Sequence, residues 1–339
     1  VASRGLGDVY KRQIFTKRPK DFPTIENFSV QDDSMPVLNK NEILLKTVYV
    51  SVDPYLRARM NNVKSYIPPF EVGEPLKSAI VAEVVESKNK NYNVGSHLYG
   101  MLDWKLYQAS DGTGLFPIPQ GLAPLSSYLG VLGVTGLTAY FGLLEIGKPK
   151  ENETLVVSGA AGAVGITVSQ IGKIKGCRVV GIAGTDEKVD SLKNKFGLDE
   201  AINYKNNINL LNELKTACPN GVDVYFDNVG GEVSDAVFYL TNNFCRIPVC
   251  GAISQYNKAA LPMGPRNNPF IISRRIKMQG FIVFDYSDKY LEAQMQLASW
   301  MKEGKVTAEE TIIEGFENIP DAFLGLFDGK NFGKMIVKI

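Results

Sequence analysis

A glycine-rich turn between a β-branched run and a helical pattern is the feature that most constrains this chain. Residues 154–157 read TLVV, residues 158–165 read SGAAGAVG, and residues 179–183 read VVGIA. The whole stretch has the length of about 30 residues that a strand, a crossover helix and a second, parallel strand require. In this order the glycines leave the backbone open to a phosphate, and the N-terminus of the helix supplies N–H groups. The sequence therefore predicts a mononucleotide-binding unit.

Length and charge restrict the domain count and the partners. With 339 residues the chain suits two domains, because single cores stop growing near ~250–300 residues. Its 37 Lys and Arg balance 36 Asp and Glu, so we expect no nucleic acid and no membrane as partner, but a small molecule. No apolar run reaches the ~20 residues that span a bilayer, and the signal-peptide pattern is missing. We therefore expect a cytoplasmic protein.

Two patterns divide the chain. Short strands with turn signals every ~8 to 12 residues come first and indicate a small barrel-like β domain. Helices and strands alternate after the glycine turn, and residues 335–339 alternate as a strand that returns to the β domain. Residues 1–13 lack an apolar period and resemble a translated leader. The expected division is a β domain (14–128 with 311–339), a parallel α/β domain (129–310) and a non-native leader (1–13).

Residues at the ends of the predicted α/β strands are candidates for a site. Buried strands are predicted at residues 222–227 and 245–250. Ligands of open α/β sheets bind at the carboxyl ends of the strands, so residues that follow different strands can share one site. The candidates are Asn228, Gly251, Ser254 and Tyr256.

The end of the second strand favours NADP over NAD. Sheets that prefer NAD place Asp or Glu there, where it accepts hydrogen bonds from the ribose 2′-hydroxyl. Here the strand ends in the neutral sequence AGT (183–185), and Lys188 follows one helical turn later, where an ammonium pairs with a 2′-phosphate. Asp186 and Glu187 weaken this interpretation, although acidic residues in a first helical turn are ordinary partners of the helix dipole.

The scarcity of metal ligands restricts the reaction. His97 is the only histidine, and none of the four cysteines forms a C-x-x-C pair, so we expect reduced thiols and no zinc site. Hydride transfer with an unactivated alcohol usually needs a Lewis acid or a poised base. We therefore expect a pre-activated acceptor, an α,β-unsaturated aldehyde or ketone, whose β-carbon receives the hydride. Hydrogen-bond donors such as Tyr55 and Tyr256 then stabilise the negative charge on the carbonyl oxygen.

Several segments together resemble one family. They are VDPYLRARM at 52–60, SGAAGAVG at 158–165, GTDEK at 184–188, NYK at 203–205, FDNVGGE at 226–232, CGAISQYN at 250–257, IIEGFENIPDAF at 312–323 and NFGK at 331–334. Over residues 14–339 the chain is similar to the zinc-independent medium-chain dehydrogenase/reductases, in the leukotriene B4 12-hydroxydehydrogenase/prostaglandin reductase and plant alkenal double-bond reductase group. The resemblance implies a Rossmann doubly wound parallel sheet domain, a GroES-like β-barrel domain and a homodimer. The apolar strand expected at 276–284 offers residues 281–284 as a sheet edge for that dimer.

The resemblance also implies a role for each matching residue. Around the cofactor, Ala161, Gly162, Ala163 and Val164 would cradle the pyrophosphate, while Gly184, Lys188 and Tyr204 would meet the adenosine end, with Lys188 at the 2′-phosphate. Asn228, Cys250, Gly251, Ala252, Ile253, Ser254 and Tyr256 would line the nicotinamide side, Phe281, Ile282 and Val283 would approach the carboxamide, and Asn331 would reach the cofactor from the other domain. Tyr55 would face the substrate carbonyl, and Tyr256 would contact the nicotinamide ribose and the substrate.

The leading hypothesis is an NADPH-dependent 2-alkenal or enone reductase. Two alternatives stay open. A quinone reductase would use the same fold without zinc, and an NADPH-binding protein would use the same turn without catalysis. The loops at 62–75 and 266–277 depart from the family pattern and are the expected substrate walls.

Overall fold

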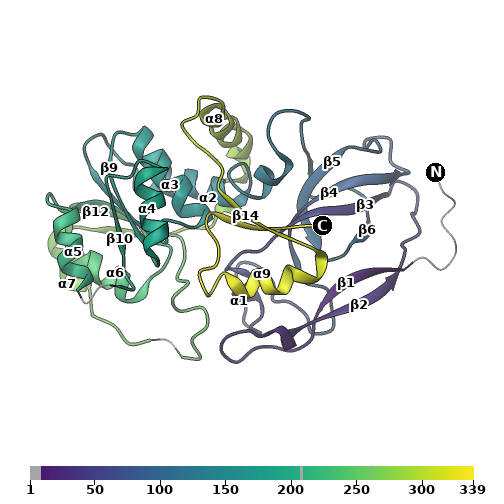
Figure 1. The fold of residues 1–339 in the computed structure, drawn as a ribbon, viewed down its shortest axis with the longest axis horizontal. Coiled ribbons are helices and arrows are strands. Elements are labelled where there is room, and N and C mark those ends of the chain that lie inside the picture. The colour runs from purple at the N-terminus through teal and green to yellow at the C-terminus, as the bar shows by residue number, and fades with distance from the viewer. Residues whose placement is uncertain (1–8, 207–208, 261) are drawn as a thin grey trace. The chain divides into compact units, whose positions relative to one another are not determined.

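The structure, a computed structural model, describes residues 9–206, 209–260 and 262–339. These residues form two compact units (Figure 1). Unit 1 contains the described residues up to Leu129, with Thr311–Lys330 and Met335–Ile339, and unit 2 contains Gly130–Glu310 and Asn331–Lys334. Each unit is built around its own sheet, so each is described separately.

Unit 2 is a doubly wound parallel α/β unit, which confirms the predicted Rossmann sheet. Its elements are α2 (Val134–Phe141), the π-helical turn η3 (Gly142–Gly147), β8 (Thr154–Ser158), α3 (Ala163–Ile174), β9 (Arg178–Ala183), α4 (Asp186–Asn194), β10 (Glu200–Asn203), α5 (Leu210–Ala217), β11 (Val222–Phe226), α6 (Gly231–Phe238), β12 (Thr241–Val249), α7 (Asn268–Arg274), β13 (Lys277–Gly280), the 3₁₀ helix η4 (Val283–Lys289) and α8 (Tyr290–Lys302). The strands lie in the order β10-β9-β8-β11-β12-β13, and neighbouring strands are parallel. The order reverses between β8 and β11, which is the switch point where such sheets bind ligands.

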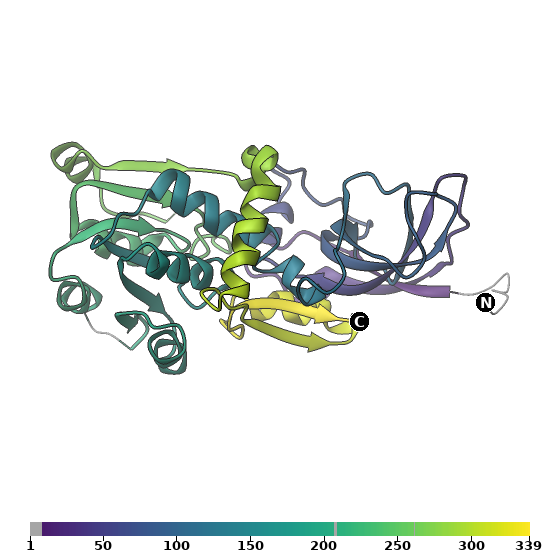
Figure 2. The ribbon, with the colours of Figure 1, turned by 90° about the horizontal axis from the view of Figure 1, so that it is seen from above.

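Helices cover both faces of this sheet because its central strands are apolar on both sides. Val156 of β8 belongs to a core that includes Leu214 of α5 and residues of α6. The next residue toward the N-terminus, Leu155, points to the opposite face, where a Cβ on Gly172 of α3 would lie 2.5 Å from its Cδ2. Helix α2 packs on α3 and on α8, the long yellow-green helix of Figure 2.

Unit 1 is a smaller antiparallel β unit. Its elements are β1 (Val9–Phe15), η1 (Ile25–Asn27), β2 (Phe28–Ser34), β3 (Ile43–Ser51), α1 (Leu56–Arg59), β4 (Lys77–Ser87), β5 (His97–Asp103), β6 (Tyr107–Ser110), β7 (Leu115–Pro117), η2 (Leu125–Leu129), β14 (Glu310–Glu314), η5 (Phe316–Asn318), α9 (Ile319–Gly325) and β15 (Lys334–Lys338). The larger sheet has the order β14-β15-β3-β4-β5-β7, β6 pairs with β3, and β1 pairs with β2. The buried Trp104 donates from Nε1 to Ser78 Oγ at 2.7 Å, and Phe28 packs on both Trp104 and Phe323 of α9.

Part of the expected leader, residues 1–13, belongs to the folded structure. Strand β1 begins at Val9 and pairs antiparallel with β2 from Val9 to Phe15. Gln13 is buried, and its Nε2 donates to the carbonyl oxygen of Phe316 at 3.3 Å. Residues 9–13 therefore belong to unit 1, whereas residues 1–8 of the expected leader lie outside the described residues.

The strand expected at 276–284 is shorter than predicted. Strand β13 covers only Lys277–Gly280, and η4 begins at Val283. After Gly280, the ring of Phe281 lies edge-on to Phe226, with centroids 6.3 Å apart, and Val283 is buried, whereas Phe284 is exposed. The interpretation of residues 281–284 as a sheet edge is therefore wrong, and β13 is the strand at that end of the described sheet.

Candidate functional site

The glycine-rich turn joins β8 to α3 at the carboxyl end of the central strand. Gly159 has a φ of +60°, and Gly162 is the N-cap of α3. A Cβ on Gly165 would lie 2.2 Å from the carbonyl oxygen of Gly159 and 2.7 Å from Ala160 Cα, so this close packing of helix on turn requires glycine. The first N–H groups of an α-helix have no acceptor within the helix, and they attract anions. The turn and the start of α3, from Ala161 to Val164, therefore suit a pyrophosphate.

A buried carboxylate connects the elements around this turn. Asp227 follows β11 and is 2 % exposed. Its Oδ1 accepts hydrogen bonds from Ser158 Oγ (3.1 Å), Tyr225 OH (2.9 Å), Val229 N–H (3.0 Å) and Gly230 N–H (2.9 Å), and its Oδ2 accepts from Ser234 Oγ (2.8 Å). Its main-chain oxygen accepts from the N–H groups of Cys250 and Gly251 after β12. One residue thus binds the end of β8, the end of β11, the start of α6 and the loop after β12.

Asn228 is oriented by β8. Its main-chain N–H donates to Ser158 Oγ at 2.9 Å, and its Nδ2 donates to the carbonyl oxygen of Ser158 at 2.8 Å. The loop after β12 lies on the same strand ends, because the N–H of Ser254 donates to the carbonyl oxygen of Val229 at 3.2 Å and its Oγ donates to the same atom at 2.6 Å. The structure therefore brings Asn228 and Ser254 together, as the strand-end pattern predicted.

Tyr256 folds back onto its own loop. Its phenolic oxygen accepts a hydrogen bond from the N–H of Ala252 at 3.1 Å, and a Cβ on Gly251 would lie 3.1 Å from that oxygen. Burial raises the pKa of the neighbouring Cys250 thiol to about 12, so this cysteine stays a protonated, unreactive thiol at neutral pH. Tyr256 is thus held close to the backbone of the strand end.

The NFGK segment packs on the glycine turn from within unit 2. Gly333 N–H donates to the carbonyl oxygen of Ala161 at 2.8 Å, and Gly162 and Gly333 form a parallel bridge. Asn331 Nδ2 donates to the carbonyl oxygen of Gly333 at 2.9 Å. The expected placement of Asn331 in the other domain is wrong, because residues 331–334 belong to unit 2. The contact of Asn331 with the cofactor stays a prediction.

Tyr55 lies in unit 1, directly before α1, and not in the unit that holds Tyr256. It packs against the core of unit 1, and burial together with the negative charge of Asp53 raises its pKa, so the phenol keeps its proton. In α1, Arg59 is buried, donates to the carbonyl oxygens of Pro68 and Lys77 at 3.0 Å each, and lies over an aromatic ring. Tyr55 therefore packs on the core of unit 1 beside the hydrogen-bonded helix α1.

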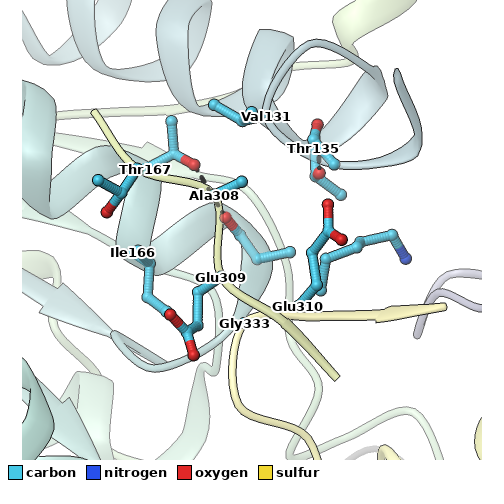
Figure 3. A pocket seen from close by; sticks show the side chains of 12 residues that line it. Val131, Thr135, Ile166, Thr167, Ala308, Glu309, Glu310 and Gly333 are labelled. Carbon is cyan, nitrogen blue, oxygen red and sulfur yellow. Dashed lines mark hydrogen bonds between the residues drawn. The ribbon is translucent and has the colours of Figure 1, made fainter. Parts of the chain in front are cut away.

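A small cavity beside α3 is not the substrate site. Its lining includes Thr135, Thr167, Glu310 and Lys334, and Figure 3 shows the Glu310 side chain extending toward Thr135. Its volume of about 10 Å³ is close to that of one enclosed water and far below the space that a nicotinamide ring or an enone needs.

Comparison with known proteins identifies the family. Residues 11–118 match the family described as the N-terminal domain of oxidoreductase, and residues 163–300 match the zinc-binding dehydrogenase family. The NADPH-dependent curcumin reductase of Escherichia coli is 43 % identical, covering 97 % of this chain and 96 % of that protein, and prostaglandin reductase 1 of Mus musculus is 46 % identical, covering 97 % and 98 %. The crystal structure of CurA from Vibrio vulnificus in complex with NADPH has 44 % identity and a TM-score of 0.93, covering 97 % of this chain and 98 % of that one.

The chain belongs to the zinc-independent medium-chain dehydrogenase/reductases of the alkenal and prostaglandin reductase group. The resemblance expected from the sequence motifs is thereby confirmed. Like its relatives in this reductase group, the chain is an NADP-dependent oxidoreductase. Within the described ranges, no group of three His, Cys, Asp or Glu side chains is arranged to hold a metal ion.

Asp227 and Ser158 of this reductase are not among the site residues that the sequence predicts. The only available signal was an acidic residue at the end of the buried run VDVYFD, where a charge needs several partners. Those partners could not be recognised because Ser158 and Ser234 lie on other elements. Two of the residues expected at the adenosine end lie together, because a Cβ on Gly184 would be 3.4 Å from Tyr204 Cε1. Lys188 lies in the first turn of α4, three residues after the N-cap Thr185.

Replacing Asp227 by Asn tests its role as the anchor of the site. The new amide would place donors against hydroxyl and N–H donors, so we expect the free energy of unfolding to fall by about 2 to 4 kcal/mol. Urea denaturation followed by circular dichroism measures this loss. The matched control is Asp190→Asn on α4, which removes an exposed carboxylate and should change stability by less than about 0.5 kcal/mol. Equal stability of the two variants would contradict the anchoring role.

Proposed function

We propose that this chain uses NADPH to reduce the carbon–carbon double bond of α,β-unsaturated aldehydes and ketones. The observation that carries the proposal is the assembly of the glycine turn, Asn228 and Tyr256 at the carboxyl ends of adjacent strands. This assembly lies in a chain whose relatives include a curcumin reductase, prostaglandin reductases and a 2-alkenal reductase. A nicotinamide cofactor at these strand ends would present its hydride beside a phenol donor.

The donor set fits a dinucleotide in a defined order along the strand ends. The pyrophosphate would lie on residues 161–164, where the N-terminus of α3 favours negative charge. The adenosine end would lie at Gly184 and Tyr204, with its 2′-phosphate at Lys188. The nicotinamide side would be lined by Asn228, Cys250, Gly251, Ala252, Ile253, Ser254, Tyr256, Phe281, Ile282 and Val283. Asn331 would contact the cofactor beside the glycine-rich turn, because its Nδ2 donates to Gly333, which is hydrogen-bonded to Ala161. Unit 2 supplies all of these residues.

When bound, NADPH supplies the hydride that adds to the β-carbon of the substrate. The chain itself must stabilise the negative charge that spreads onto the carbonyl oxygen, and this requires hydrogen-bond donors. Tyr55 and Tyr256 are the phenol donors in this proposal. The raised pKa of Tyr55, caused by burial and by Asp53, keeps its donor proton in place at neutral and mildly alkaline pH. Water then protonates the α-carbon.

A steady-state screen of 2-alkenals, enones and quinones with NADPH tests the proposed reaction. We expect NADPH oxidation together with a product that mass spectrometry identifies as the saturated aldehyde or ketone. Activity confined to quinones would replace the proposal with quinone reduction. Tight NADPH binding without turnover of any compound would replace the proposal with an NADPH-binding protein that has no catalytic activity.

Replacing Tyr256 by Phe should lower turnover by about 100- to 1,000-fold, the range expected when one donor to an oxyanion is lost. The affinity for NADPH should change little, because the ring and the backbone of the loop remain. Stopped-flow hydride transfer and NADPH fluorescence titration measure the two effects separately. Tyr239→Phe is the matched control, because Tyr239 is exposed and lies at the C-terminal end of α6. Unchanged hydride transfer in Tyr256→Phe would remove this residue from the site.

We also propose a homodimer formed through β13. This strand ends the sheet order, and apolar side chains are exposed on it and on the elements that follow it in the chain: Met278 on β13, Phe284 in η4, and Leu291 and Met295 on α8. Unpaired strand edges with apolar flanks favour pairing with a second copy. Light scattering after gel filtration should give twice the mass of the chain, and Met278→Asp should shift the mass toward one chain. Val94→Asp, at an exposed turn of unit 1, should leave the mass unchanged. A single-chain mass for the unmodified protein would disprove the dimer.

We propose the cytoplasm as the location of the chain. The four cysteines are unpaired in the structure, which suits a reducing compartment. No described helix has the length and apolar character that crossing a membrane would require.

A further inference from the structure

The NYK segment places a second lysine beside Lys188. The hydrogen bond from Tyr204 N–H to Ala183 continues the pairing of β10 with β9 beyond the last strand residues. Lys205 then lies over Gly184, because a Cβ on Gly184 would be 3.3 Å from Lys205 Cε and 3.7 Å from its Cδ. The absence of a side chain at residue 184 therefore lets the lysine stem lie against the strand end.

The two lysines influence each other. Lys188 is half-buried, and its pKa is lowered by burial and also by the positive charge of Lys205. Two ammonium groups at one strand end repel, and an anion between them relieves that repulsion.

Asp186, two residues before Lys188, is held by amides. Asp186 accepts from Asn203 Nδ2 at 2.7 Å and from Asn206 Nδ2 at 2.9 and 3.1 Å. It also lies at the first position of α4, after the N-cap Thr185, where the helix dipole favours a carboxylate. Asp186 therefore has stabilising partners of its own, which weakens the objection that this acid excludes a phosphate.

We propose that Lys205 is a second specificity-determining residue for NADP, whose ammonium binds the 2′-phosphate together with Lys188 above Gly184. The proposal rests on the placement of the adenosine end under "Proposed function". A phosphate monoester carries close to two negative charges at neutral pH, which matches two ammonium groups. NADH lacks this phosphate and gains nothing from the two ammonium groups, so both lysines favour NADPH over NADH.

Isothermal titration of the full chain with 2′,5′-ADP and with 5′-AMP tests the proposal without catalysis. Lys205→Ala should weaken 2′,5′-ADP binding about tenfold, the effect of losing one charged hydrogen bond, and should leave 5′-AMP binding unchanged. Lys205→Arg keeps the charge and should retain most of the affinity. Lys193→Ala is the matched control, because Lys193 lies on α4 and pairs with Glu200 at 3.0 Å. This control should change neither ligand.

The outcomes separate this inference from the placement on which it rests. Unchanged 2′,5′-ADP affinity in Lys205→Ala, with a loss in Lys188→Ala, would overturn the role of Lys205 and keep the placement. No loss in either variant would overturn the placement of the adenosine end as well. An equal loss of 2′,5′-ADP and 5′-AMP in Lys205→Ala would also overturn the proposal, because the lysine would then not act through the 2′-phosphate.

Discussion

The buried carboxylate of Asp227 holds the candidate site together. An ionised group in a dry interior is stable only when hydrogen-bond donors replace its water. Asp227 has such donors from Ser158 at the end of β8, from Tyr225 in β11 and from Ser234 in α6. Because these donors come from separate elements, the requirement to satisfy one charge fixes the relative positions of the strand ends. The orientation of Asn228 follows, since it is bonded to the same Ser158.

Three glycines around Asp227 shape the candidate site because they have no side chain. Gly165 allows α3 to begin directly on the turn, which brings the N–H groups of the helix to the position of a pyrophosphate. Gly251 leaves room for the phenol of Tyr256, and Gly184 leaves room for Lys205. Each glycine thus admits a different group: backbone donors at the middle of the strand ends, a phenol at one side and a cation at the other.

Local features of the fold were predictable from the sequence, and features set by distant contacts were not. The structure confirms the predicted strand β8, the glycine-rich turn, the helix α3 and the strand β9. They could be predicted because hydrophobic period and glycine spacing are local signals. The length of β13 was overestimated because the apolar run continues to residue 284, whereas the strand ends at Gly280, before Phe281 makes a contact with Phe226 that no local pattern contains. Asp227 was missed for the same reason. Lys188 could be recognised by its spacing from the strand, whereas the position of Lys205 over Gly184 depends on the pairing of β9 with β10.

The boundary of unit 2 near the C-terminus is set by main-chain hydrogen bonds that composition does not reveal. The N–H groups of Gly333 and Lys334 donate to the carbonyl oxygens of Ala161 and Glu309, both in unit 2. Only two residues later, Ile336 pairs with β3 of unit 1. A Cβ on Gly333, whose φ is +70°, would lie 2.0 Å from the oxygen of Glu309. Glycine is therefore required directly before β15, because residues 333 and 334 must pack on the glycine-rich turn and on Glu309 and then start the strand.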